Sequence, residues 1–408
     1  MLLTHIFRIL IKDGRLDLID AKGRRHRFGS GGGPVVTVRL HDPALHRKMV
    51  INPKLAFGEA YMDGTLTIEE GTLYDALDLV TRNLGAVERH PLQALQTLLA
   101  QALHFVHTYN PIGRAQRNVA HHYDLSGTLY DLFLDRDRQY SCAYFATDND
   151  SLELAQLNKK RHIASKLLLE PGQRVLDIGS GWGGLALFLA EAEKIDITGV
   201  TLSNEQHRVS EERAREAGMA ERVKFHLRDY RLQAGTFHRI VSVGMFEHVG
   251  SKHYLEFFRK IRDLLTDDGV MLLHAIGRME PPGTTNPWLR KYIFPGGYTP
   301  ALSEVMRAIE DVGLWVTDVE ILRLHYAKTL REWNRRFQDN RDRIRQLYDE
   351  RFCRMWEFYL QGCEVAFKNL GQMVFQIQLA KRQDAAPLTR EYMFEDERRL
   401  ARRPSAAA

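Results

Sequence analysis

Residues 171–184, with the sequence PGQRVLDIGSGWGG, constrain the fold of this 408-residue chain more than any other segment. The apolar run at 175–178 predicts a buried strand, and four glycines within the next six positions predict a tight turn. The stretch LALFLAEA that follows predicts a helix. Glycines let the backbone approach a bound molecule closely, and the first turn of a helix offers unpaired N–H donors. We therefore expect a ligand site between a strand and a helix of an α/β fold.

Two cofactor classes fit this segment at first sight. The string matches GxGxxG at Gly179, Gly181 and Gly184, a pattern of dinucleotide sites, which also need an acid about 20 positions later. Thr201 occupies that region, whereas an acid, Asp177, lies inside the strand. This arrangement resembles motif I of class I S-adenosylmethionine-dependent methyltransferases. The resemblance implies S-adenosylmethionine as cofactor; a strand–turn–helix without a ligand is the remaining alternative.

Strand and helix patterns alternate from residue 152 onward, which predicts a doubly wound, mostly parallel sheet. The candidate strands are RVLDIG, IDITGVT, VKFHLRD, RIVSVG, VMLLHAI, WVTDVEIL and MVFQIQLA. A loop-like insertion is expected at 291–300. Together with motif I, the pattern predicts a seven-stranded α/β fold of the class I methyltransferase type, which is Rossmann-like.

A smaller α/β domain is expected before it. The pieces RLDLID, PVVTVRL and GTLTIEE read as strands, while 43–51 and 72–81 read as helices. Leucines at helical spacing over 91–106 predict an amphipathic helix, which either packs on a core or faces lipid. HTYNPIGRAQ then reads as a linker. We expect an N-terminal lipid-associated domain at 1–106, a catalytic domain at 107–390 and a polar, frayed tail at 391–408.

Composition and charge narrow the class of protein. With 57 basic and 52 acidic residues the surface is mixed, and no recognition motif indicates a nucleic-acid partner. The basic run at 22–27 suits contact with anionic headgroups. No apolar run reaches 18 residues and no signal peptide is evident. Three cysteines without CxxC spacing predict neither disulfides nor a metal site. We expect a cytoplasmic protein.

Further motifs follow one another in the order found in one enzyme family. They are HYDLS at 122–126, YSCAYF at 140–145, motif I at 176–184, TLSNEQ at 201–206, FEHVG at 246–250, LLHAIG at 272–277, FPGGY at 294–298 and HYAKTLREW at 325–333. Joined together, these motifs closely resemble the cyclopropane-fatty-acyl-phospholipid synthase family. FGEAYMDG at 57–64 resembles the extra N-terminal domain of its bacterial phospholipid enzymes. Ser180 departs from the usual cysteine of the family, but that position contributes backbone.

The resemblance implies a reaction and a base. Members transfer a methyl group from S-adenosylmethionine to a cis double bond of a phospholipid acyl chain, and the resulting carbocation loses a proton to bound bicarbonate and closes to a cyclopropane. The implied bicarbonate ligands are Cys142, Glu247, His274, Ile276 and Tyr326, with Cys142 and Ile276 contributing main-chain groups. Without the resemblance, His274 would read as a satisfied core histidine and Tyr326 as a core aromatic.

The implied cofactor residues cluster at the ends of the first three strands of the catalytic domain and around the YSC motif. They are Tyr140, Ser141, Asp177, Gly179, Gly181, Trp182, Gly183, Thr201, Leu202, Ser203, Gln206, Asp229 and Tyr230. The Gln206 amide can replace the missing acid at the ribose hydroxyls. Aromatic faces such as that of Tyr140 suit a cationic sulfonium.

Two other functions stay open at this stage. The same scaffold can give the carbocation a different fate, with a methyl-branched, methylene or hydroxylated product. A non-catalytic S-adenosylmethionine- or lipid-binding protein is the other alternative, although Glu247 and the glycine turn are both retained. The expected partners are unsaturated phospholipids at the inner membrane surface, bound peripherally, and a homodimer is compatible with the sequence.

Overall fold

The computed structural model describes residues 2–33, 35–84 and 127–402, and the chain forms two compact units. Unit 1 consists of Met1–Val106, Gly283–Pro295 and Ala327–Gln372, and unit 2 of His107–Pro282, Gly296–Tyr326 and Met373–Ala408. The sequence predicts that the first domain is one continuous stretch ending at residue 106. In the structure, the first unit also contains two later segments of the chain. The helix expected at 91–106, the linker after it and the HYDLS motif lie outside the described residues.

Gly58 in α3 (Pro53–Met62) shows why the later segments belong to unit 1. A β-carbon at Gly58 would lie 2.5 Å from the ring of Trp288 and 2.9 Å from the ring of Phe358. Trp288 is in α12 (Pro287–Tyr292) and Phe358 is in α16 (Glu350–Asn369). The two rings also pack edge to face, with centroids 4.6 Å apart. The apolar face of α3 is thus buried by segments more than two hundred residues away.

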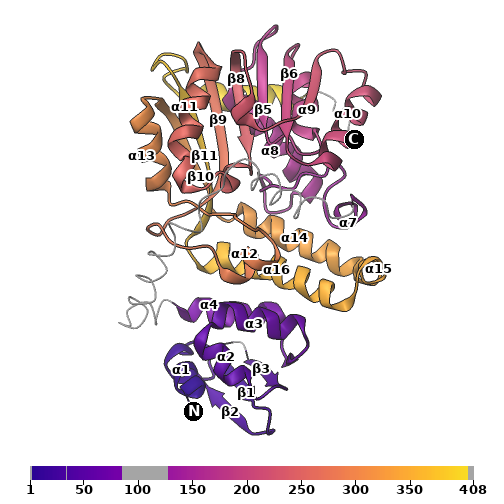
Figure 1. Ribbon diagram of the computed structural model, residues 1–408, viewed down its shortest axis with the longest axis vertical. Helices are drawn as coiled ribbons and strands as arrows, with labels where there is room; N and C mark the ends of the chain where they lie inside the picture. Colours follow the sequence, from indigo (N-terminus) through magenta and orange to yellow (C-terminus); the bar gives the residue numbers. More distant parts are fainter. Residues whose placement is uncertain (1, 34, 85–126, 403–408) are drawn as a thin grey trace. The chain divides into compact units, whose positions relative to one another are not determined.

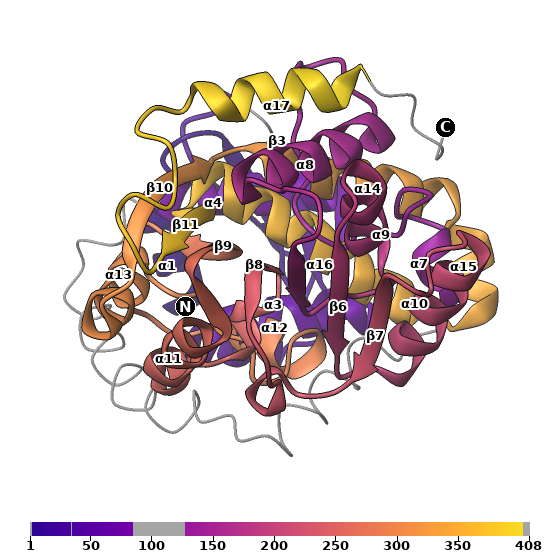
Figure 2. The ribbon, with the colours of Figure 1, turned by 90° about the horizontal axis from the view of Figure 1, so that it is seen from above.

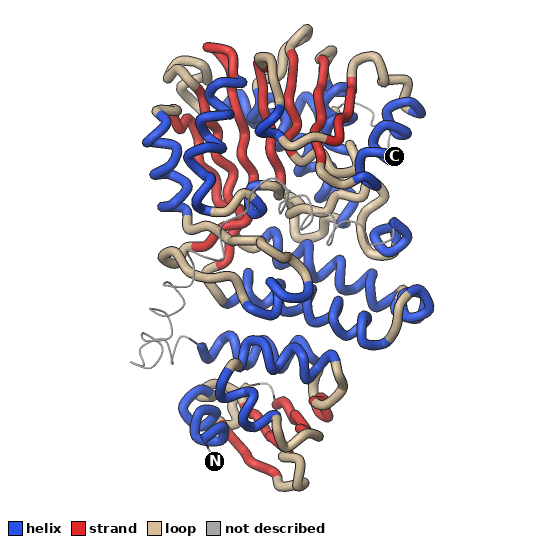
Figure 3. Tube along the Cα trace, viewed as in Figure 1, coloured by secondary structure: helices blue, strands red, loops and turns tan. Residues whose placement is uncertain are grey.

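Unit 1 is built on a four-stranded sheet with the order β2-β1-β3-β4 (Figure 3). Its strands are β1 (Arg15–Ile19), β2 (Arg25–Phe28), β3 (Val35–Leu40) and β4 (Leu66–Glu70). β1 pairs antiparallel with β2 and parallel with β3, while β3 pairs antiparallel with β4. The structure confirms the three strands predicted from apolar patterns. It adds β2, whose sequence RHRF contains a single apolar residue.

The other helices among the described residues of unit 1 are α1 (Leu2–Leu10), α2 (Leu45–Ile51), α4 (Leu73–Asn83), α15 (Arg341–Leu347) and most of α14 (His325–Asp339), which starts in unit 2. The helices expected at 43–51 and 72–81 are confirmed as α2 and α4. Thr72 accepts a hydrogen bond from the N–H of Asp75, and the Asp75 carboxylate accepts one from the N–H of Thr72. This capping box explains why α4 starts where it does.

The basic run at 22–27 is largely ion-paired. Arg24 pairs with Asp20 at 2.9 Å, and Arg27 pairs with Asp17 at 3.3 Å. Arg25 lies 3.7 Å from Asp17, and His26 lies 3.3 Å from Asp20. Two buried carboxylates thus offset much of the positive charge that the sequence shows at this turn. The run is a weaker lipid-binding feature than its sequence suggests.

Unit 2 contains a seven-stranded sheet with the order β10-β11-β9-β8-β5-β6-β7 (Figure 1). Its strands are β5 (Arg174–Ile178), β6 (Asp196–Thr201), β7 (Val223–Leu227), β8 (Phe237–Val243), β9 (Leu265–Arg278), β10 (Trp315–Leu322) and β11 (Gln372–Ala380). The β5–β6, β6–β7, β5–β8 and β8–β9 pairs are parallel, and β10 pairs antiparallel with β11. All seven predicted strands and the doubly wound sheet are confirmed.

Helices cover both faces of this sheet. α11 (Tyr254–Leu264) and α13 (Leu302–Val312) bury Phe257, Phe258 and Ile309 against one face. The other face is covered by α8 (Leu152–Leu167), α9 (Gly184–Ala192), α10 (Asn204–Glu216) and α17 (Glu391–Ala401). A short α7 (Gly127–Asp131) precedes the YSCAYF segment. The carboxyl ends of the parallel strands therefore meet at one edge, where ligands bind in such folds.

The expected frayed tail is wrong for residues 391–401. These residues form α17, which runs along α8 (Figure 2) and buries Met393 and Leu400. The prediction relied on the polar composition of this segment. The helix nevertheless packs on unit 2 with only two buried apolar side chains. Among the described residues, no helix is both long and apolar enough to cross a bilayer.

Candidate active site

The turn after β5 is closed on two sides by residues from other elements. A β-carbon at Gly179, whose φ is 82°, would lie 2.7 Å from Cβ of Met245. A β-carbon at Gly184 would lie 2.5 Å from the carboxylate oxygens of Asp137 and 2.6 Å from Nε2 of Gln139. The glycines are therefore needed for close packing around the turn as well as for its backbone shape.

A cavity opens at this turn, at the carboxyl edge of β5, β6 and β8. Its lining includes the predicted residues Tyr140, Ser141, Asp177, Gly179, Gly181, Trp182, Thr201, Leu202, Gln206, Asp229 and Tyr230. The residues that line it without having been predicted include Asp137, Gln139, Arg231, Met245 and His248. Side chains from four separate motifs thus surround one space.

Gly183 and Ser203 do not line the cavity, although the resemblance assigns both to the cofactor. Gly183 begins α9 with a φ of 81°, and a β-carbon there would lie 2.7 Å from the ring of Phe225. Ser203 is fully buried and caps α10, its Oγ accepting a hydrogen bond from the N–H of Gln206 at 3.3 Å. Gly183 and Ser203 are the N-caps of α9 and α10, and these helix starts place Gly184 and Gln206 at the cavity.

Segment 137–141 is fixed to the cavity wall by two lysines of α8. The ammonium of Lys159 donates to Oε1 of Gln139 at 2.6 Å and to Oγ of Ser141 at 2.8 Å. Lys160 pairs with Asp137 at 2.6 Å, and Arg213 pairs with the same carboxylate. Burial lowers the pKa of Lys159 to about 8. The ring of Tyr140 packs on Tyr130, with centroids 5.5 Å apart.

Asp177 is a buried acid without a complete set of partners. Its Oδ2 has no hydrogen-bond partner among the described residues, and the side chain lies at the cavity wall. Burial raises the pKa of Asp177 to about 7, although the charge of Lys159 opposes the shift. A buried carboxylate in this state needs a cation beside it. A ligand with an ammonium or sulfonium group fits this position.

The cavity residues that follow β6 and β7 are polar and are held by contacts with one another. Thr201 donates through Oγ1 to Oε1 of Gln206 at 2.9 Å, which orients the amide. Asp229 pairs with Arg231 at 2.7 Å and caps the short turn that starts at Tyr230. The guanidinium of Arg231 lies 5.7 Å from the ring centre of Tyr230. These contacts present an aromatic face and an amide to one ligand.

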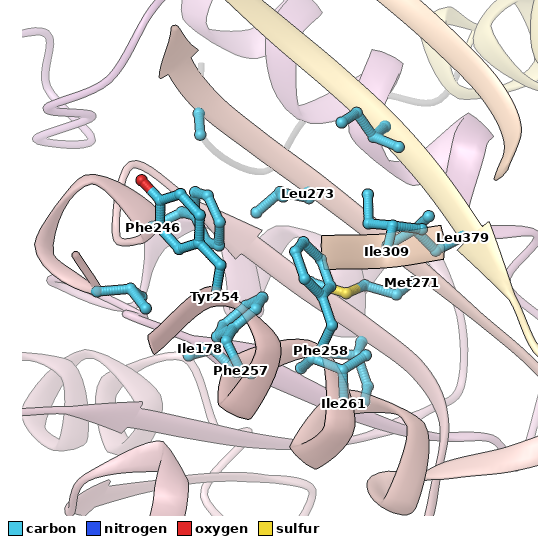
Figure 4. Packing of buried hydrophobic residues seen from close by; sticks show 14 of the residues in the cluster. Ile178, Phe246, Tyr254, Phe257, Phe258, Ile261, Met271, Leu273, Ile309 and Leu379 are labelled. Carbon is cyan, nitrogen blue, oxygen red and sulfur yellow. The ribbon is translucent and has the colours of Figure 1, made fainter. Parts of the chain in front are cut away.

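Glu247 follows Phe246, which belongs to the hydrophobic core, and precedes His248, which lines the cavity. Phe246 anchors Glu247, stacking on Tyr254 and meeting Phe257 edge to face in the cluster of Figure 4. The N–H of Ile276 donates to Oε1 of Glu247 at 2.6 Å, whereas Oε2 is buried and has no partner among the described residues. Burial raises the pKa of Glu247 to about 7. Met245 and His248, on either side of it in the chain, line the cavity.

The other predicted anion ligands lie in β9, in α14 and in the segment before α8. His274 is buried in β9 beside Ile276, and its Nδ1 accepts from the amide of Gln376 at 3.1 Å, so that the ring carries its proton on Nε2. Burial lowers the pKa of His274 to about 3, which keeps it neutral. Cys142 is buried, its Sγ 3.4 Å from the carbonyl of Ala143. Tyr326 is buried near the start of α14.

The structure thus joins Glu247 to Ile276 directly and places His274 on the same strand. Cys142 and Tyr326 lie on separate segments, and the cavity lining contains none of these five residues. The sequence interpretation missed Asp137, Gln139 and Lys159. The signal for them was the run DRDRQY directly before the SCAYF residues, followed by the lysine pair at 159–160. The acids of this run and the lysines that follow it are opposite charges that can pair.

Comparisons with known proteins agree with this geometry. The family described as mycolic acid cyclopropane synthetase matches residues 112–377, and a domain of unknown function matches residues 15–89. A probable fatty acid methyltransferase of Pseudomonas putida is 33% identical over 90% of this chain and 94% of its own. The cyclopropane-fatty-acyl-phospholipid synthase of Escherichia coli K12 is 36% identical over 84% of this chain and 88% of its own.

A solved structure extends the likeness to the cofactor. The mycolic acid cyclopropane synthase CmaA1 complexed with SAH and CTAB superposes with a TM-score of 0.62 at 33% identity. The match covers 66% of this chain and 99% of that one. Because the family match spans residues 112–377 and the Escherichia coli relative is similar over most of its length, the chain belongs to the mycolic acid cyclopropane synthetase family and is an S-adenosylmethionine-dependent methyltransferase.

Proposed function

We propose that the protein uses S-adenosylmethionine to bridge a cis double bond of an unsaturated phospholipid acyl chain with a methylene group, forming a cyclopropane ring, and that bicarbonate is the base. Glu247 carries this proposal. Its carboxylate is buried, one oxygen is fixed by the N–H of Ile276, and the other has no partner among the described residues. A buried acceptor of this kind, beside a cavity that suits a sulfonium, fits a site that holds a small anion in place.

The cofactor side of the site positions an electrophile. S-adenosylmethionine supplies a methyl group on a positively charged sulfur. Asp177 holds the ammonium of its methionine part, because its unpaired oxygen needs a cation. The aromatic cluster around Tyr140 offers ring faces to the sulfonium, and Gln206 binds the ribose hydroxyls. An alkene is a weak nucleophile, so this fixed placement is the main help that the protein gives to the transfer.

The base side must remove a proton without adding to the carbocation. In this proposal, bound bicarbonate is the weak base that takes the proton, and no side chain does so. Glu247 accepts its O–H, while the Nε2–H of neutral His274 and the hydroxyl of Tyr326 donate to its oxygens. Cys142 and Ile276 contribute main-chain groups. The N–H of Ile276 is bound to Glu247 in this structure, so the anion competes for that donor.

A methyl-branched product is the second candidate. The Pseudomonas putida relative, described as a probable fatty acid methyltransferase, favours it. Both reactions start with the same methyl transfer. Proton loss with ring closure gives the cyclopropane, whereas proton loss without ring closure gives a methyl-branched or methylene alkene of the same mass. Because Glu247, His274 and Tyr326 are all present, we favour ring closure.

The test combines two measurements on purified protein. Vesicles of a cis-unsaturated phospholipid are incubated with S-adenosylmethionine in buffer stripped of carbon dioxide, with and without added bicarbonate. Release of S-adenosylhomocysteine reports transfer, and mass spectrometry before and after hydrogenation separates a cyclopropane from its alkene isomer. No release of S-adenosylhomocysteine overturns the proposed function. Equal rates with and without bicarbonate overturn the proposed base alone.

The lipid substrate also implies a location at the surface of the inner membrane. We propose peripheral contact, to which the ion-paired run at 22–27 adds little. Flotation with anionic and neutral vesicles at low and high salt tests this. Binding that ignores both lipid charge and salt argues against electrostatic contact.

A further inference from the structure

The C-terminal helix α17 reaches the interior of unit 2 through Glu397. This carboxylate hydrogen-bonds to Nδ1 of His162 in α8, and the carboxylate of Glu320 in β10 hydrogen-bonds to Nε2 of the same ring at 2.7 Å. Carboxylates at both ring nitrogens require a proton on each, so His162 is held as an imidazolium. Burial opposes this charge, but the two hydrogen bonds outweigh it and raise the pKa of His162 above its ordinary value.

The charged ring supports the segment that carries Cys142. Tyr144, two residues later, stacks on His162 with ring centroids 4.3 Å apart and planes 17° apart. The other face of Tyr144 stacks on His325, with centroids 4.8 Å apart and planes 10° apart. His325 also accepts a hydrogen bond from the N–H of Phe145 at 3.0 Å and directly precedes Tyr326. One tyrosine ring therefore ties two segments with predicted anion ligands to His162.

A second connection leads from the same ring to His274. Glu320 in β10 pairs in register with Gln376 in β11, and Gln376 donates to His274. Burial is the main cause of the low pKa of His274, and the charges of Lys159, Lys166 and His162 lower it further. Lys166 also pairs with Glu320.

The attachment of α17 does not depend on Glu397 alone. Arg390, just before the helix, pairs with Asp318 at 2.5 Å, and the hydroxyl of Tyr392 accepts from Gln378 at 2.8 Å. Met393 and Leu400 are buried. The family match ends at residue 377, before this helix begins. A change at Glu397 can therefore alter the charge on His162 while the helix remains docked.

We propose that His162, clamped between Glu397 of α17 and Glu320, is a positioning residue of the active site, which holds the Tyr144–His325 stack. The inference rests on the proposed function, because it assigns the stack to the anion site. The C-terminal helix is then part of the catalytic apparatus, although it contributes no group to the reacting atoms.

The experiment compares Glu397→Gln with Glu395→Gln in the full chain. Glu395 lies on the same helix and is exposed, so the control makes the same charge change away from His162. Release of S-adenosylhomocysteine is measured against pH with saturating phospholipid vesicles, and cofactor affinity is measured by calorimetry. This readout does not depend on which lipid product forms.

Glu397→Gln is expected to lower kcat about three- to tenfold at pH 8, with cofactor affinity unchanged. Loss of one carboxylate lowers the pKa of His162, so the alkaline limb of kcat moves toward lower pH by about one unit. The groups that face His162 and set this limb are Glu320, Glu397, Lys166 and Tyr144. Glu397→Asp should restore part of the activity, and Glu395→Gln should behave as wild type.

A second pair of variants protects the test against misfolding. Tyr144→Phe keeps the stacked ring and should retain kcat, whereas Tyr144→Leu should lose about tenfold in kcat. If Glu397→Gln and Glu395→Gln share one pH profile while the wild type turns over, the positioning role of His162 is wrong. If the wild type itself releases no S-adenosylhomocysteine, the proposed function fails instead.

Discussion

Two strand aspartates, one in each unit, are equally buried and in opposite electrostatic situations. Asp17 in β1 is 0% exposed and Asp177 in β5 is 2% exposed. Asp17 lies within 3.7 Å of three arginines, and although burial opposes it, the hydrogen bonds of Arg15 and Arg27 lower the pKa of Asp17. Burial raises the pKa of Asp177 to about 7, and its Oδ2 has no partner among the described residues.

The difference shows that burial of an acid says little about its role until its partners are counted. Asp17 is satisfied by its own unit and stabilises the β1–β2 hairpin. Asp177, like Glu247, retains a buried oxygen that has no partner among the described residues, and we assign that oxygen to a ligand. Structural acids and binding acids can therefore be separated in one chain, and the separation can be tested.

The largest effect is expected at Glu247. Glu247→Gln replaces the single acceptor of the anion site with an amide that also donates, so turnover should fall by roughly 10²-fold or more. Affinity for S-adenosylmethionine should stay within about twofold, because the contacts proposed for it are at Asp177 and Gln206, which line the cavity. Turnover on vesicles and calorimetric titration are the measurements. Normal turnover in this variant would remove Glu247 from the proposed mechanism.

Asp177→Asn should weaken cofactor binding by about 10- to 100-fold, since a hydrogen bond to a charged group contributes about 1.5–3 kcal/mol. In the wild type, affinity should rise with pH up to about 7, where Asp177 becomes ionised before binding, and then level off. The variant should lose this pH dependence. Calorimetry at pH 6 and pH 8 measures both, and unchanged affinity in the variant would contradict the binding role.

Stability should respond in the opposite direction at this position. The folded pKa of Asp177 is above its unfolded value, so the folded state binds more protons and loses stability as pH rises from about 4 to 7. Without ligand, Asp177→Asn should therefore melt at the same or a higher temperature than wild type at pH 8. The difference should shrink at pH 5. A lower melting temperature at pH 8 would place Asp177 among the structural acids.

Asp17→Asn should give the smallest effect, a decrease of a few degrees in melting temperature without change in cofactor affinity. Three arginines lose their acceptor, but all three are partly exposed and can be hydrated instead. Because ion pairing lowers the folded pKa of Asp17, its contribution is present above the unfolded value and is lost toward acid pH. Thermal unfolding at pH 7 and pH 3 tests this, and an altered cofactor affinity would break the contrast with Asp177.

The sequence predicts most of unit 2 because its signals are local. Each of the seven strands contains a continuous or alternating apolar pattern, and the clustered glycines mark the turn after β5. The cavity residues follow because parallel strands end at one edge. Unit 1 is predicted less well, since β2 is polar and the pairing of Gly58 with Trp288 and Phe358 spans most of the chain.

The least predictable parts of the site are its long-range charge pairs. Asp137 meets Arg213 across 76 residues, and His162 meets Glu397 across 235. No periodicity marks such pairs, since each side chain alone reads as a solvated surface charge. The predicted domain boundary at residue 106 fails for the same reason, because contacts between distant segments leave no local pattern in the sequence. Removing residues 1–106 would uncover Trp288 and Phe358, so such a truncation would damage folding rather than isolate a catalytic domain.

The orphan oxygen of Asp177 has a consequence for the life of the protein in a cell. Ligand that binds only the folded state stabilises it in proportion to its concentration relative to the dissociation constant. Proteases act on the small population that opens, so this population shrinks when the methyl donor is abundant. The supply of S-adenosylmethionine would then set how long each copy of the protein survives as well as how fast it works.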